Sequence, residues 1–148
     1  MNIRRAKSVD AEELHNLYFK HLTPHPPKEA QDMPVWRDMI TRFENDPRYY
    51  LLVGEVDGRI VSSVTLVLIE NLTHNLCPYA IIENVVTLKG FRGKHYATGL
   101  MERACEIAKD HSCYKMMLLT GSKEDSTLHF YKNCGFNCDD KTAFIKWL

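Results

Sequence analysis

Two runs of aromatic and β-branched residues, 49–56 and 59–69, flank the dipeptide Asp57-Gly58. Such runs are typical of β-strands. Asp-Gly is typical of a two-residue hairpin turn, because both residues tolerate the positive φ that the turn requires. The sequence therefore predicts a long antiparallel hairpin near the middle of the chain, and the fold must contain a sheet built around it.

The next segment predicts a strand–helix–strand unit. Residues 80–88 form a nearly continuous apolar run, which is typical of a strand buried on both faces. An amphipathic helix is expected from about residue 97 to residue 111, with a further strand over 115–120. A connection of this kind favours parallel pairing of the two strands.

The remaining segments add elements at both ends. Residues 2–7 are expected to form an edge strand, and Ser8 and Asp10 offer N-caps for a helix that carries Leu14, Leu17, Tyr18 and His21. A second helix is expected over 34–45. A short helix over 127–134 is closed by Gly135 in the left-handed conformation, and a strand over 143–148 ends the chain. The order β-α-α-β-β-β-α-β-α-β predicts one mixed α/β domain over residues 1–148.

Composition excludes several classes of protein. Lys plus Arg and Asp plus Glu each number 19, and this neutral balance argues against a dedicated nucleic-acid binder. No apolar run reaches the roughly 18–20 residues that span a bilayer, and the charged start lacks the apolar stretch of a signal peptide. Five cysteines without a C-x-x-C pair argue against a disulfide framework or a zinc module. We expect a reduced, cytoplasmic chain with no nucleic-acid or membrane partner and no metal; the spacing of His21, His25 and His74 does not support a metal site.

A basic loop, Lys89-Gly90-Phe91-Arg92-Gly93-Lys94-His95-Tyr96-Ala97, joins the buried strand to the amphipathic helix. Free amides at a helix N-terminus attract phosphate, Gly93 permits a close approach, and Arg92 and Lys94 add positive charge. The loop is neither a Walker A loop nor a Rossmann fingerprint. Two interpretations stay open from the residues alone: a phosphate site, or a solvated basic turn.

Three segments, in this order, resemble the GNAT N-acetyltransferase superfamily. They are the strand Ile82-Glu83-Asn84-Val85-Val86-Thr87, the loop Arg92-Gly93-Lys94-His95-Tyr96-Ala97, and Phe130-Tyr131-Lys132-Asn133-Cys134-Gly135-Phe136. The loop is similar to the family pattern Arg/Gln-x-x-Gly-x-Gly/Ala, and the last segment to Phe-Tyr-x-x-x-Gly-Phe. Two positions depart: Tyr96 stands where the loop usually has its second glycine, and Glu124 where many members carry Asn. The resemblance covers all 148 residues and implies a central mixed sheet of six to seven strands flanked by about four helices.

The resemblance implies acetyl-CoA as co-substrate and direct acetyl transfer to an amine, without a covalent acyl-enzyme and without a metal. The pantetheine arm would lie along the strand backbone, and the pyrophosphate would rest on the loop amides. The residues implied to hold the cofactor are Val85, Val86, Thr87, Arg92, Gly93, Lys94, His95, Tyr96 and Ala97.

Two side chains are the implied catalytic groups. Tyr131 is expected to give a proton to the leaving thiolate, and the alternative is a tyrosine of the core. Glu83 is the expected general base, directly or through water, because a carboxylate in an apolar strand needs a partner or a raised pKa. Its alternative is a structural ion pair. A backbone N–H at a bulge near Val86 would polarise the thioester carbonyl.

The acceptor is expected to be a small amine. The sequence has likeness to glucosamine-6-phosphate and to aminoalkylphosphonate N-acetyltransferases, and His21, His25 or Arg37 is expected near the acceptor. A non-catalytic acyl-CoA-binding sensor or regulatory module is the main alternative, with an unrelated nucleotide-binding protein behind it. A homodimer is also predicted, through the terminal strand with Phe144 and Trp147.

Overall fold

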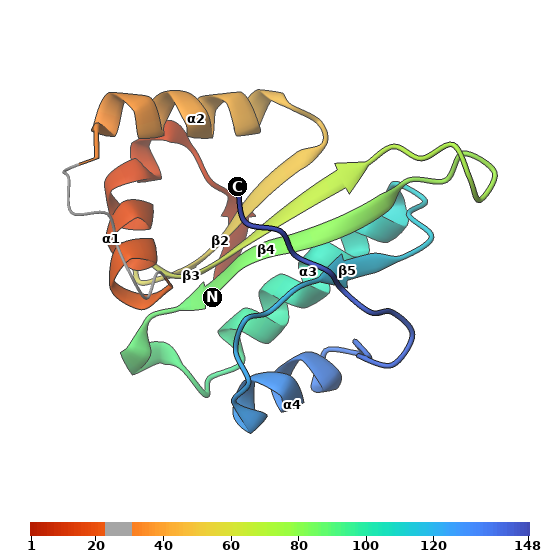
Figure 1. The fold of residues 1–148 in the computed structure, drawn as a ribbon. Helices are drawn as coiled ribbons and strands as arrows, with labels where there is room; N and C mark the ends of the chain where they lie inside the picture. The colour runs from red at the N-terminus through yellow and green to blue at the C-terminus, as the bar shows by residue number, and fades with distance from the viewer. Residues whose placement is uncertain (23–30) are drawn as a thin grey trace.

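The computed structural model describes residues 1–22 and 31–148, which form a mixed five-stranded sheet in the order β1-β2-β3-β4-β5 (Figure 1). Neighbouring strands are antiparallel except β4 and β5, which are parallel. The strands are β1 (Asn2–Arg5), β2 (Tyr49–Val56), β3 (Arg59–Ile69), β4 (Tyr79–Thr87) and β5 (Met116–Leu118). The parallel pairing across the strand–helix–strand unit confirms the sequence prediction.

Helices cover both faces of the sheet (Figure 1). One core cluster joins the sheet to α1 and α2, and the other joins it to α3, with side chains of α4 packed at its margin. The helices are α1 (Ala11–His21), α2 (Met33–Asn45), α3 (Tyr96–Asp110) and α4 (Asp125–Asn133), with short 3-10 turns η1 (Ser8–Asp10) and η2 (Lys89–Phe91). The mixed α/β class and the four helices agree with the sequence analysis, and Gly135 follows α4 with a φ of 87° as expected.

The central hairpin forms as predicted. Asp57 and Gly58 have φ angles of 51° and 75°, and Val56 pairs with Arg59 across the turn. Side chains alternate between the two faces along a strand. Leu52 therefore lies in the α3-side cluster, while Leu51 lies in the cluster under α1 and α2.

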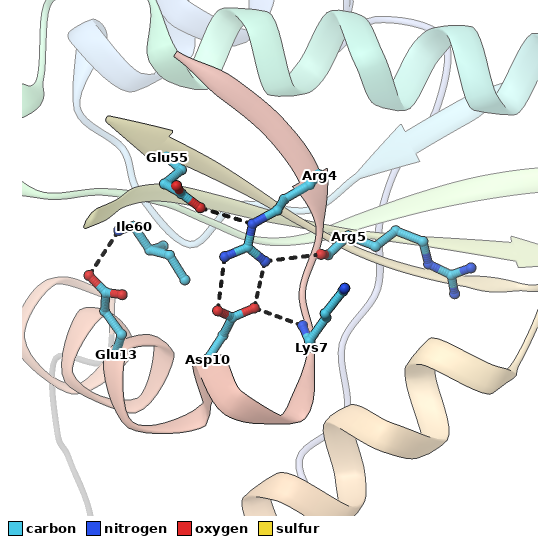
Figure 2. A network of polar contacts seen from close by, with 7 residues as sticks. All are labelled: Arg4, Arg5, Lys7, Asp10, Glu13, Glu55 and Ile60. Atoms are coloured by element: carbon cyan, nitrogen blue, oxygen red, sulfur yellow. Dashed lines mark hydrogen bonds and ion pairs between the residues drawn. The ribbon is translucent and has the colours of Figure 1, made fainter. Parts of the chain in front are cut away.

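A polar network fixes the start of α1 to the sheet (Figure 2). The Arg4 guanidinium on β1 donates to both carboxylate oxygens of Asp10 at 2.7 and 2.9 Å, and its Nε donates to Glu55 on β2 at 2.9 Å. One turn further, the amide of Ile60 donates to Glu13 at 2.8 Å. Asp10 is the residue before α1, as predicted, but its carboxylate accepts from Arg4 instead of capping α1. These contacts set where α1 lies over the sheet.

The predicted last strand is wrong. Residues 143–148 form no strand, and Phe144 and Trp147 are exposed. The described residues therefore make five strands, not six to seven. The physical reason is that a strand exists through its ladder partner, and the end of this chain has none within the described residues.

The prediction that 80–88 is buried on both faces is also wrong for its second half. Ile82 and Val86 are buried, but Glu83 and Asn84 are exposed. The reason is that β5 pairs with only the first part of β4, opposite Ala80, Ile81 and Ile82. The uncovered second half of β4 is the starting point for the functional site.

Candidate active site

The sheet opens between β4 and β5. The two strands pair over three residues each, 80–82 with 116–118. β4 then continues to Thr87 without β5 beside it. A bulge begins at the same point: Glu83 lies opposite Thr65 and Val86 opposite Ser63, so three steps on β4 match two on β3. Asn84 has a φ of 54° there. The bulge bends β4 where its second neighbour ends.

The second half of β4 presents backbone groups to this opening. The Leu88 amide donates to the Val61 carbonyl of β3 at 2.9 Å, and Val86 faces β3 likewise, because antiparallel residues alternate between the two edges. The Val85 carbonyl and the Thr87 amide therefore point away from β3. The Thr87 carbonyl, on that side too, accepts from Arg92 Nε at 3.1 Å. Of the three strand residues predicted to bind the cofactor, Val85 and Thr87 are suitably oriented.

The basic loop follows at once and ends at the N-terminus of α3. Residues 92–95 are exposed, and Gly93 has a φ of 74° with nothing within 4 Å of the position of a Cβ. His95 has a φ of 61°, whereas Tyr96 is the first residue of α3. The position whose backbone favours glycine is therefore His95, and the expectation that it would be Tyr96 is wrong.

The N-terminus of α3 offers unused donors. The first bond of the helix runs from the Gly99 amide to the His95 carbonyl at 3.1 Å, so the amides of Tyr96, Ala97 and Thr98 have no acceptor within the helix. Among the residues that the structure describes, no side chain caps this end, and no acidic residue lies in the first turn. Free amides, the dipole of a 15-residue helix and a neighbouring basic loop make a site suited to a diphosphate.

Tyr131 lies on α4, half-buried against the α3-side core. Its ring is 5.1 Å from that of Phe130 and 6.4 Å from that of Phe136, measured between centroids. Burial raises the pKa of the Tyr131 hydroxyl, and negative charge on Cys134 and Glu83 raises it further. The hydroxyl therefore stays protonated at neutral pH. The fold brings Tyr131 and Glu83 within electrostatic range, although 48 positions separate them in the sequence.

Glu83 is exposed to solvent, so its carboxylate does not require a partner within the protein. None of the ion pairs within residues 1–22 and 31–148 involves it, so the ion-pair alternative is not supported. Residues directly opposite each other in an antiparallel pair point to the same face. Glu83 therefore shares the α1–α2 face of the sheet with Thr65, its partner on β3.

A cavity of about 250 Å³ lies on this face, between α1, α2 and the sheet. Most of its described lining is apolar or aromatic, and the residues are Leu14, Tyr18, Val35, Trp36, Met39, Ile40, Phe43, Leu51, Thr65 and Asn84. The Tyr18 hydroxyl lies 3.1 Å from Ser63 Oγ, and burial raises the Tyr18 pKa. A larger, shallow depression of about 710 Å³ beside Arg42 and Arg48 contains none of the predicted site residues.

Sequence reasoning missed this cavity, because helical spacing alone interprets Trp36, Met39 and Ile40 as core. Asn84 connects the cavity to the bulge, since it lines the first and has the positive φ of the second. The Asn within this strand was the one available signal, because Asn tolerates the left-handed conformation better than most residues.

The remaining predicted contacts lie apart from the cavity or outside the described residues. Arg37 forms a 2.6 Å ion pair with Glu12, and His74 stacks on Tyr114. His21 is the last residue of α1, and His25 lies outside the described residues. Within the described ranges, no group of three His, Cys, Asp or Glu side chains is placed to hold a metal ion. In the same ranges, no helix has the length and apolar character needed to cross a bilayer.

Comparison with known proteins identifies the family of this chain. The family described as "Acetyltransferase (GNAT) family" matches residues 10–136. A glucosamine 6-phosphate N-acetyltransferase from Trypanosoma brucei brucei is 29% identical over 121 residues, which cover 82% of this chain and 79% of the relative. The likeness to that enzyme agrees with the sequence analysis.

Solved structures agree in fold. A protein from Agrobacterium tumefaciens str. C58, described as a candidate acetyltransferase, superimposes with a TM-score of 0.89 at 34% identity and full coverage of both chains. Glucosamine-6-phosphate N-acetyltransferase from Arabidopsis thaliana has a TM-score of 0.85 at 20% identity, over 99% of this chain and 97% of that one, and shows the fold alone. The matching family and the curated relative identify an acyltransferase enzyme, in preference to a non-catalytic module. The chain belongs to the acetyltransferase (GNAT) family.

Proposed function

We propose that this protein transfers the acetyl group of acetyl-CoA directly to a primary amine of a small molecule. The observation that carries the proposal is the opening beside β4, which runs from the bulge at Asn84 to the free amides of α3. This opening provides backbone donors and acceptors along its side and a positive helix end at its base. A long, amide-containing chain that ends in a diphosphate matches that order of groups.

The cofactor contacts follow from the orientation of the backbone. The Val85 carbonyl and the Thr87 amide would bind the amides of the pantetheine arm, extending the sheet as an added strand would. The diphosphate would lie on the amides of Tyr96, Ala97 and Thr98. Arg92, held by the Thr87 carbonyl at 3.1 Å, and Lys94 would supply positive charge. Gly93 would allow the phosphates to approach the main chain.

The chemistry needs three groups around the thioester. The amine nitrogen forms a bond to the carbonyl carbon, the carbon–sulfur bond breaks, the amine loses a proton and the thiolate gains one. Glu83, directly or through water, would accept the first proton, and Tyr131 would donate the second. Asn84 and Val85 have no ladder partner in the bulge, so one of their amides would polarise the carbonyl. The bulge was expected near Val86, and its unpaired residues are the two that precede Val86.

The acceptor would enter through the cavity under α1 and α2. That cavity meets the bulge at Asn84 and lies on the same face as Glu83, so an amine within it would reach the thioester carbon beside a base. A volume of about 250 Å³ has room for the reacting end of a small molecule. The described part of the lining contains no Lys or Arg, which favours an amine with an apolar body over a phosphorylated one.

The first experiment is calorimetric titration of the purified protein with acetyl-CoA, with ATP plus magnesium as the control. Acetyl-CoA should bind and ATP should not. Release of free CoA thiol is then measured with a panel of amines that contains glucosamine 6-phosphate, an aminoalkylphosphonate, a polyamine and an arylalkylamine. Binding of ATP alone, or of neither compound, would refute the proposal.

The same panel separates the enzyme from an acyl-CoA-binding module. A module would bind acetyl-CoA and release no thiol with any amine, whereas the proposed enzyme should turn over at least one. Lys123→Ala is the matched control, because it removes an exposed charge near α4 and changes none of the residues proposed to contact the cofactor. This variant should keep both the affinity and the turnover of the wild-type protein.

A further inference from the structure

Helix α2 carries more apolar surface than the protein covers. Five large apolar side chains at helical spacing form one stripe along it and line the cavity: Val35, Trp36, Met39, Ile40 and Phe43. Only Ile40 is buried, whereas Val35 is 55% exposed and Met39 40%. An apolar helix face normally packs against a core. Among the described residues, most of this stripe therefore lacks an apolar partner.

The polar groups of the cavity are gathered at its other end, on the sheet. In the described lining they are the side chains of Thr65 and Asn84 and the hydroxyl of Tyr18. Glu83 lies opposite Thr65 in the ladder and on the same face of the sheet. No residue of the described lining is charged. The cavity is therefore polar only where it approaches the proposed base.

The bulge in β4 accounts for this arrangement. Successive side chains of a regular strand point to opposite faces. Glu83 and Asn84 are successive, yet both lie on the α1–α2 face, because the bulge interrupts the alternation and Asn84 has a φ of 54°. An amine at this end could donate to the Asn84 or Thr65 oxygen and still lie beside Glu83. Its apolar surroundings would favour the neutral amine, which is the nucleophilic form.

We propose that the acceptor is a small hydrophobic primary amine. Its nitrogen lies beside Thr65 and Asn84, and its apolar body lies along Val35, Trp36 and Met39 and covers the stripe of α2. This inference rests on the proposed function and names the class of acceptor. A phosphorylated or polyhydroxylated amine would bury polar groups against the stripe without partners in the described lining, which is unfavourable. The residues of α2 thus determine specificity, whereas those of the bulge serve the reaction.

The primary test is kcat/KM of the full chain for straight-chain primary amines, from ethylamine to hexylamine, at saturating acetyl-CoA. The value should rise about fourfold with each added methylene until the cavity is filled, because each one is removed from water. Aminohexanol should be about tenfold poorer than hexylamine, because its hydroxyl enters an apolar site. A flat series, or a preference for glucosamine 6-phosphate over every apolar amine, would overturn the inference and leave acetyl transfer itself intact.

Val35→Asp tests whether α2 contacts the acceptor. Val35 is the third residue of α2, and a negative charge in the first turn of a helix is favourable, so the variant should fold. Its kcat/KM for hexylamine should fall about tenfold, with the affinity for acetyl-CoA unchanged. Leu72→Asp is the matched control, because Leu72 is 89% exposed in the loop between β3 and β4, and it should keep the wild-type values. Equal kcat/KM in Val35→Asp and wild type would overturn the inference.

A binding measurement separates this inference from the proposed function. The chain has two tryptophans, so Trp147→Phe leaves Trp36 as the only one. With CoA present and no acetyl group to transfer, hexylamine should move the emission of Trp36 to shorter wavelength, because the bound body displaces water from the ring. No change at concentrations that saturate turnover would overturn the inference. A shift without turnover of any amine would support this ligand class for the cavity and refute the proposed acetyl transfer.

Discussion

Asp10→Asn tests whether the Arg4 network holds α1 on the sheet. The Asp10 side chain is 8% exposed, and it accepts two hydrogen bonds from Arg4, at 2.7 and 2.9 Å, and one from the Lys7 amide at 2.7 Å. Asparagine keeps the volume and loses the negative charge, and its NH₂ group cannot accept from Arg4. The guanidinium then keeps Glu55, at 2.9 Å, as its anionic partner.

The size of the effect follows from burial. Hydrogen bonds to charged groups contribute about 1.5–3 kcal/mol, and removing one partner of a fully buried pair costs about 3–5 kcal/mol. The Arg4 side chain is 30% exposed, so water replaces part of what it loses. We expect the free energy of unfolding at pH 7 to fall by about 2 kcal/mol. For a chain of this length, that lowers Tm by about 4–8 °C.

The effect should also depend on pH. Burial alone would raise the pKa of Asp10, but the hydrogen bonds and charges of Arg4 and Lys7 outweigh it and lower the pKa below its usual 3.8. A carboxylate whose pKa is lowered by folding contributes stability that is complete above the pKa of the unfolded chain and is lost as the pH falls through the folded value. The difference between wild type and Asp10→Asn should therefore be constant above about pH 5 and should shrink below about pH 4.

The assay is urea unfolding followed by circular dichroism at pH 7, pH 5 and pH 3.5. Glu106→Gln is the control, because it neutralises a carboxylate in the exposed 2.8 Å pair with Arg103 and should cost at most about 0.5 kcal/mol. Equal stability of Asp10→Asn and wild type at pH 7 would refute the reasoning. So would a difference that does not change between pH 7 and pH 3.5.

Three further predictions concern the active site. Tyr131→Phe should lower kcat by about 10²–10⁴-fold and leave acetyl-CoA affinity unchanged, and an unchanged kcat would remove Tyr131 as the acid. Because burial and the charges of Cys134 and Glu83 raise the pKa of Tyr131 above 10, kcat at saturating substrate should not fall with rising pH below pH 10; a fall at pH 8–9 would assign the proton to another group. Gly93→Val should weaken acetyl-CoA binding about tenfold in calorimetry, because a branched residue is strained at a φ of 74°, whereas Gly90→Val, with φ in the ordinary range, should bind normally.

The hairpin and the strand–helix–strand unit could be predicted because their signals are local. Asp57-Gly58 determines its own turn, and the apolar stripe of α3 determines which face it buries. The bulge could not be predicted, because it is a mismatch of three steps on β4 with two on β3, and no single strand contains that information. The left-handed residue of the loop was assigned one position too late, at Tyr96, because the pattern does not show where α3 begins.

The terminal strand was wrong for a different reason. Residues 143–148 have the composition of a strand, and composition cannot say which edge a strand will use.

The candidate site, too, could be predicted only in part. Tyr131 and Glu83 came from the resemblance, and the fold brings them within electrostatic range, but their roles stay predictions. The cavity under α1 and α2 was hidden, because its lining residues have the spacing of a core.

The open edge of β4 has a consequence for how this sequence can change over time. The groups that it offers, the Val85 carbonyl and the Thr87 amide, belong to the main chain, and almost any side chain leaves them in place. Mutations there can accumulate with little effect on what the edge binds. The cavity under α1 and α2 is built from side chains, so each replacement in it alters the shape and polarity that an incoming molecule meets. Substitutions can therefore change which molecules the cavity admits, while the main-chain groups of β4 stay the same.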